Sequence, residues 1–145
     1  MTDPLSTSES RSMSSPIRDW AVPQVLTLDN GLTLLISVLP HLGTASMGLY
    51  IRVGSRYERA GEHGVSHLLE HLLFRGCAGY PTSRELNVAI ESLTPGLDAS
   101  TGREFTALEA ICAPENLPRL LRVVGAMVTA PVLDGVDAER EIILQ

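Results

Sequence analysis

The 145-residue sequence lacks the features that define several large classes of protein. No apolar run approaches the roughly 20 residues that a bilayer-spanning helix needs, so no membrane span is expected. The formal net charge of −6 offers no basic surface for nucleic acid or for an anionic membrane. The two cysteines, Cys77 and Cys112, lack the spacing of a disulfide framework. This favours two buried or half-buried thiols in a reducing compartment over a disulfide.

The first twenty residues also lack the marks of a targeting segment. They are rich in serine and contain Asp3, Glu9 and Asp19. They therefore have neither the apolar core of a secretory signal nor the acid-poor character of a mitochondrial presequence. We expect a flexible tail over residues 1–20, one globular domain over residues 21–145, and a cytoplasmic location.

What the sequence does contain is a short apolar segment, residues 64–74, that carries three ionisable side chains. His67 and His71 are four residues apart and Glu70 is three after His67, so a helix would place all three on one face. Burying them with the surrounding leucines is costly unless they are paired or bind something. Two neutral imidazoles at this spacing can fill two corners of a zinc tetrahedron, leaving room for a third ligand and a water.

The order His-x-x-Glu-His is itself a zinc-peptidase signature, the reverse of His-Glu-x-x-His. The simpler alternative is two hydrogen-bonded core histidines beside an unrelated glutamate. His63 also lies four residues before His67, but on a straight helix it would be about 12 Å from His71. We therefore place His63 in the loop or the first turn, outside the site.

Hydrophobic periodicity predicts strands and helices in alternating groups. The predicted third helix opens at Pro114 and buries Leu117, Leu120, Leu121, Val124 and Val128. A fourth helix, capped by Asp134, runs to Gln145 without a stop signal, which suggests a truncated chain. The predicted strands are 22–28, 32–38 (a hairpin through Asp29-Asn30-Gly31), 44–53 and one within 100–113. The first predicted helix carries the two histidines and ends at Gly76, and the second runs from 83 to about 93.

Several further motifs stand in order along the chain: Gly54-Ser55-Arg56 with Glu58, Gly64, His67 to His71, Phe74-Arg75-Gly76, Asp98-Ala99-Ser100-Thr101 and Glu139-Arg140. Together they resemble the N-terminal half of the M16 zinc peptidases (pitrilysin, insulysin, mitochondrial processing peptidase), from about Val22 to Gln145. The resemblance implies an α+β fold, a mixed or antiparallel sheet backed by helices in two layers, incomplete at its C-terminal end. In that family two such halves close a chamber around the substrate.

The resemblance also implies roles for individual residues. His67 and His71 would be zinc ligands, Glu70 the catalytic base, and Glu139 the family's buried glutamate beside the metal. The third ligand would be a glutamate at position 146, just beyond Gln145.

Asp98, Ala99, Ser100 and Thr101 would match the edge-strand segment that holds substrate backbone by strand addition. The family usually has Asn-Ala-x-Thr here, and an aspartate cannot donate a hydrogen bond as an amide does. A capped turn that enters the following strand is the alternative for these four residues.

The sequence thus predicts a zinc-dependent metalloendopeptidase domain that acts on extended peptides. Its expected partner is a second M16-like half, in the same full-length chain or in a separate subunit. The 145-residue chain alone is expected to bind zinc weakly and to have little activity. One alternative is a non-catalytic partner or scaffold subunit of a two-half chamber; a weaker one is an enzyme that matures a small peptide-derived cofactor.

Overall fold

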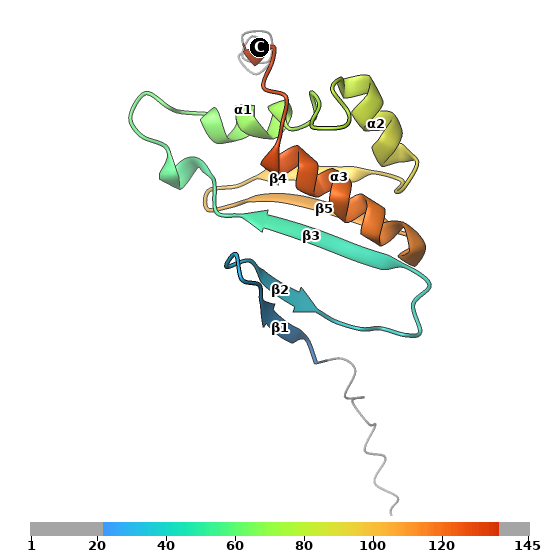
Figure 1. Cartoon of the computed structure of the whole chain (residues 1–145). Coiled ribbons are helices and arrows are strands. Elements are labelled where there is room, and N and C mark those ends of the chain that lie inside the picture. The colour runs from blue at the N-terminus through green and yellow to red at the C-terminus, as the bar shows by residue number, and fades with distance from the viewer. Residues whose placement is uncertain (1–21, 137–145) are drawn as a thin grey trace, which may run out of the picture. The chain divides into compact units, whose positions relative to one another are not determined.

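A computed structural model of the chain describes residues 22–136 (Figure 1). The chain divides into two compact units, residues 1–41 and 42–145, which are described separately. The smaller unit contains an antiparallel hairpin of β1 (Gln24–Thr27) and β2 (Thr33–Ile36). Gly31 takes a φ of 84° in its turn, and the Asn30 side chain accepts a hydrogen bond from the Leu32 N–H at 3.1 Å. The predicted hairpin is confirmed, with strands shorter than expected.

The larger unit is a three-stranded antiparallel sheet with three α-helices on one side of it (Figure 1). The strand order is β3-β5-β4, so β5 is central and β4 has one neighbour among the described strands. This arrangement confirms the expected α+β architecture of two layers. The elements are β3 (Ala45–Ile51), η2 (Ser55–Tyr57), α1 (Val65–Leu72), α2 (Ser83–Glu91), β4 (Leu97–Thr101), β5 (Thr106–Cys112), η3 (Pro114–Asn116) and α3 (Leu117–Thr129).

The core lies between the sheet and the helices. Alternate residues of β5 face inward, and β3 alternates between half-buried and exposed residues as its sequence predicts. Thr82 and Glu85 form a capping box at the start of α2. The largest fully buried side chains are Leu86, Leu108, Leu120, Met127, Val124 and Cys77.

The hairpin of β4 and β5 differs from the prediction of a single strand within residues 100–113. Residues Leu97–Thr101 pair with β5, and Asp98 lies opposite Glu109. The alternative of a capped turn at residues 98–101 is therefore wrong. Leu97, Ala99 and Thr101 are half-buried while the residues between them are exposed, so the segment has the period of two that a strand requires.

The buried face of α3 is shifted by about one residue around the helix from the predicted face. Leu121 is half exposed, whereas Val123 and Met127 are buried. Both sets of residues satisfy helical spacing, so periodicity alone does not decide between them.

Both cysteines are buried and free, as expected. Burial raises the pKa of each thiol, and the nearby Glu115 carboxylate adds to the rise at Cys112. No helix within residues 22–136 is long and apolar enough to cross a bilayer. The predicted tail at residues 1–20, nearly all of the fourth helix, and Glu139 lie outside the described residues.

Candidate metal centre

Helix α1 begins at a turn that is fixed by a distant carboxylate. Gly64 precedes the helix with a φ of 88°, a conformation that favours glycine, and no side chain at this position caps the helix. Glu58 fills that role: its Oε2 accepts from the Gly64 N–H and its Oε1 from the Ser66 N–H, both at 2.9 Å. These backbone donors, Ser66 first, hold the pKa of Glu58 below its usual value. The first turn of α1, which includes His67, is thereby anchored.

The loop that supplies Glu58 is tied to the turn between β4 and β5. The Ser55 N–H donates to the Gly102 carbonyl at 3.3 Å, and the Arg56 N–H donates to the Arg103 carbonyl at 2.9 Å. A Cβ at position 54 would lie 2.6 Å from the Gly102 oxygen, so this close approach requires glycine. Arg56 and Glu104 add an exposed ion pair across the same junction.

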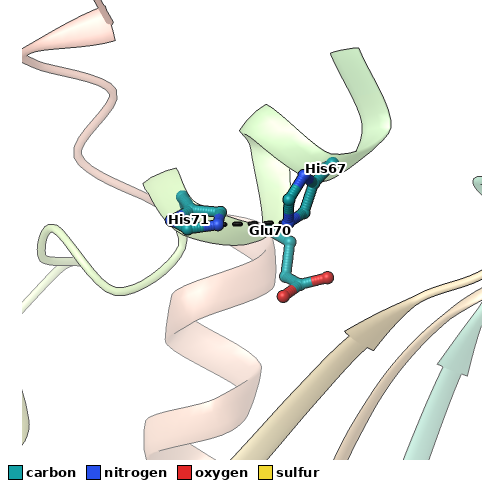
Figure 2. A group of neighbouring side chains, drawn as sticks. All are labelled: His67, Glu70 and His71. Atoms are coloured by element: carbon teal, nitrogen blue, oxygen red, sulfur yellow. Dashed lines mark hydrogen bonds between the residues drawn. The ribbon is translucent and has the colours of Figure 1, made fainter. Parts of the chain in front are cut away.

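The two histidines of α1 turn their rings toward one another (Figure 2). Their Nε2 atoms are 3.2 Å apart, and the ring planes are inclined by 76°. Two nitrogens at the Zn–N distance of a tetrahedral ion would be separated by about 3.3 Å. The spacing fits two corners of a zinc site, and it also allows one N–H···N hydrogen bond between the rings.

Glu70 completes the cluster. One ligand atom from each of the three side chains lies within 4.8 Å of the others. The Glu70 carboxylate also accepts a hydrogen bond from the Thr101 hydroxyl at the end of β4.

His67, Glu70 and His71 are not all buried in the described structure, contrary to the prediction. His67 is exposed, and Glu70 and His71 are half-buried. Val65 and Leu69, one turn apart, are 51% and 37% exposed. A helix of eight residues presents one face to this small sheet, and no described part of the chain covers the other. The predicted convergence nevertheless holds, because it depends only on helical spacing.

The remaining predicted residues divide according to the side of β4 on which they lie. Asp98 and Ser100 are exposed, while Ala99 and Thr101 face the helix layer and are half-buried. Only Thr101 reaches the cluster. His63 lies in the turn before α1, as expected. The contact of Thr101 with Glu70 was not predicted, although the alternation along β4 indicates which side of the strand Thr101 faces.

The family model for insulinase, peptidase family M16, matches residues 36–145. The chain belongs to the M16 peptidase family. It is 32% identical over 120 residues to the beta subunit of the mitochondrial-processing peptidase of Saccharomyces cerevisiae, covering 81% of this chain and 26% of that protein. It is also 32% identical over 123 residues to an uncharacterized zinc protease of Rickettsia bellii, covering 83% and 30%.

A solved structure gives the same result for the fold of this M16 chain. The crystal structure of a protease from Helicobacter pylori matches with a TM-score of 0.76 and 25% sequence identity, over 85% of this chain and 30% of that one. The M16 chain thus spans less than a third of the length of these relatives. The family and the fold inferred from the sequence motifs are confirmed.

Proposed function

We propose that this chain forms the zinc-binding part of a metallopeptidase that hydrolyses extended peptides. The observation that carries the proposal is the convergence of His67, Glu70 and His71 on one face of α1, with ring nitrogens at the separation of two zinc ligands. Membership of a peptidase family that includes proteins named as zinc proteases supports it.

The three side chains would have distinct roles. His67 and His71 would hold Zn²⁺ through their Nε2 atoms, with a further carboxylate that we place at position 146 by resemblance to the family. Bound zinc would bring the pKa of a water toward neutrality and polarise the scissile carbonyl. The Glu70 carboxylate would take the proton from that water and pass it to the leaving amine.

Strand β4 would hold the peptide. It has one neighbour, β5, among the described strands, so its other edge carries backbone groups that the described sheet does not pair. An extended peptide can add to such an edge through its own backbone, largely independently of its sequence. The exposed Asp98 and Ser100 lie along β4, and a second M16-like half would complete the chamber.

Zinc binding tests the ligand assignment. Equilibrium dialysis of the 145-residue chain should show binding that His67→Ala weakens by at least about tenfold, if one ligand contributes a few kcal/mol. His63→Ala is the matched control, because His63 lies in the turn just before α1 and outside the cluster. Equal affinities for wild type and His67→Ala would refute the site.

Peptide hydrolysis tests the reaction. The zinc-loaded protein, with its second half supplied, should cleave unstructured peptides, and a chelator should stop it. Cleavage that survives Glu70→Gln would remove Glu70 from the mechanism. Stoichiometric zinc without cleavage would favour the alternative of a non-catalytic partner subunit.

A further inference from the structure

Thr101 connects the candidate base to the sheet. It is the last residue of β4, and its Oγ1 donates a hydrogen bond to Glu70 Oε2 on α1, 31 residues earlier in the chain. The resemblance to the family placed Thr101 in the peptide-holding segment. In the structure its side chain lies on the opposite side of β4 from Asp98 and Ser100, facing the helices.

The surrounding hydroxyl groups determine where the Thr101 proton goes. The buried Thr106 donates its own proton to the Val53 carbonyl at 3.0 Å. Its Oγ1 lies 3.3 Å from Thr101 Oγ1. A hydroxyl has a single proton, so Thr106 has none left to donate to Thr101. An ionised carboxylate can only accept, and the Thr101 proton is therefore directed to Glu70.

We propose that Thr101 is the positioning residue for Glu70, a role that rests on the proposed function of Glu70 as the base. A glutamate side chain has several rotatable bonds, and a fixed donor selects one orientation of its carboxylate. Threonine suits this task because its β-branched side chain is restricted at χ1 and its backbone is held in a strand. The restraint matters because small displacements of a catalytic group cost large factors in rate.

This arrangement also couples two parts of the proposed reaction. β4 would present its free edge to the peptide and, at its last residue, its hydroxyl to the base. The peptide backbone and the proton acceptor are then positioned by one strand.

Kinetics on the zinc-loaded protein with its second half test the positioning role. Thr101→Val keeps the shape and removes the hydroxyl, so kcat should fall about 10- to 100-fold while KM and zinc affinity change less than about twofold. Thr101→Ser restores the hydroxyl and should bring kcat to within about threefold of wild type. Ser46→Ala removes an exposed hydroxyl from β3, the opposite edge strand of the sheet, and controls for general disturbance of the sheet. An unchanged kcat in Thr101→Val, or a Thr101→Ser variant as slow as Thr101→Val, would overturn the proposal.

A double-mutant cycle in the metal-free 145-residue chain gives a readout that needs no activity. Urea unfolding of Thr101→Val, Glu70→Ala and the double variant should show coupling of about three- to tenfold in the unfolding equilibrium constant. A threonine that only stabilises β4 would give additive effects, and additivity would overturn the inference even in an active enzyme. If Thr101 and Glu70 are coupled but peptide cleavage does not depend on Glu70, the contact is supported and the proposed function of Glu70 is refuted.

Discussion

The sheet carries two hydroxyl-to-carboxylate hydrogen bonds, one on each face. On the outer face the Tyr50 hydroxyl donates to Glu109 at 2.5 Å, and both residues are exposed. On the inner face Thr101 donates to Glu70, which α1 brings within 4.8 Å of two imidazole nitrogens. The bonds are chemically alike, and their surroundings differ. Within residues 22–136, His67, Glu70 and His71 form the one group of three side chains suited to a metal, and Glu109 is not part of it. The neighbours of a carboxylate, more than its hydrogen bond, indicate its function.

The largest expected difference between the two carboxylates is in catalysis. Glu70→Gln should lower peptide hydrolysis by about 10²–10⁴-fold, the usual contribution of a general base. Glu109→Gln removes the same charge from the other face and should change the rate by less than about twofold. Steady-state kinetics on the two variants make the comparison. Equal losses would show that the inner face has no special role.

The two faces should also differ in their contribution to stability. Leu108 is fully buried on the inner side of β5, whereas Ile111 is 59% exposed on the outer side. Leu108→Ala should reduce the free energy of unfolding by about 2–5 kcal/mol, because it leaves a cavity in the core. Ile111→Ala should cost less than about 1 kcal/mol. Urea titrations measure both values, and a large loss at Ile111 would show that its side chain is covered in the folded chain.

Acid should loosen the candidate site at the start of α1. The pKa of Glu58 is lowered in the folded protein by the Ser66 and Gly64 N–H groups, so its stabilising effect is fully present above the unfolded value of 4.5. The effect is lost as the pH falls through the lower, folded pKa. Hydrogen exchange of the Gly64 and Ser66 amides, corrected for intrinsic rates, should become faster as the pH falls through the folded pKa of Glu58. Glu58→Gln should remove the dependence, and Glu91→Gln, at the end of α2, should leave it intact.

The smallest effect is expected for the outer-face hydrogen bond. Tyr50→Phe should leave the unfolding midpoint at neutral pH almost unchanged, because exposed polar contacts contribute little. The hydrogen bond to Glu109 and the charge of Glu109 raise the pKa of Tyr50. Their contribution to the stability of the folded state is therefore present below pH 10 and is lost as the pH rises through the higher, folded pKa. Alkaline titration of tyrosine absorbance should show one late-ionising group that is missing in Tyr50→Phe.

The sequence predicted the parts of this structure that depend on local spacing. The convergence of His67 and His71 follows from a separation of four residues on a helix, and the hairpin turn at Gly31 follows from its turn chemistry. Periodicity alone missed strand β4, because alanine and threonine, at positions 99 and 101, give a weak alternation. An edge-strand segment at residues 98–101 was expected only from the resemblance to the family. The Thr101–Glu70 contact depends on strand register and on how the helix packs on the sheet, and neither has a local signal.

The short connection from Val53 to Glu58 contacts residues that flank the candidate site, both in the sheet and at the start of α1. The Val53 carbonyl accepts a hydrogen bond from the Thr106 hydroxyl. The backbone N–H groups of Ser55 and Arg56 donate to carbonyls of the β4–β5 turn, and the Glu58 carboxylate accepts from the start of α1. These six residues therefore act as a spacer of fixed length between the proposed base and the strand that would hold its substrate. Surface connections usually tolerate insertions. Here one added residue would shift Glu58 relative to Val53, so we expect an insertion in this loop to disturb the start of α1.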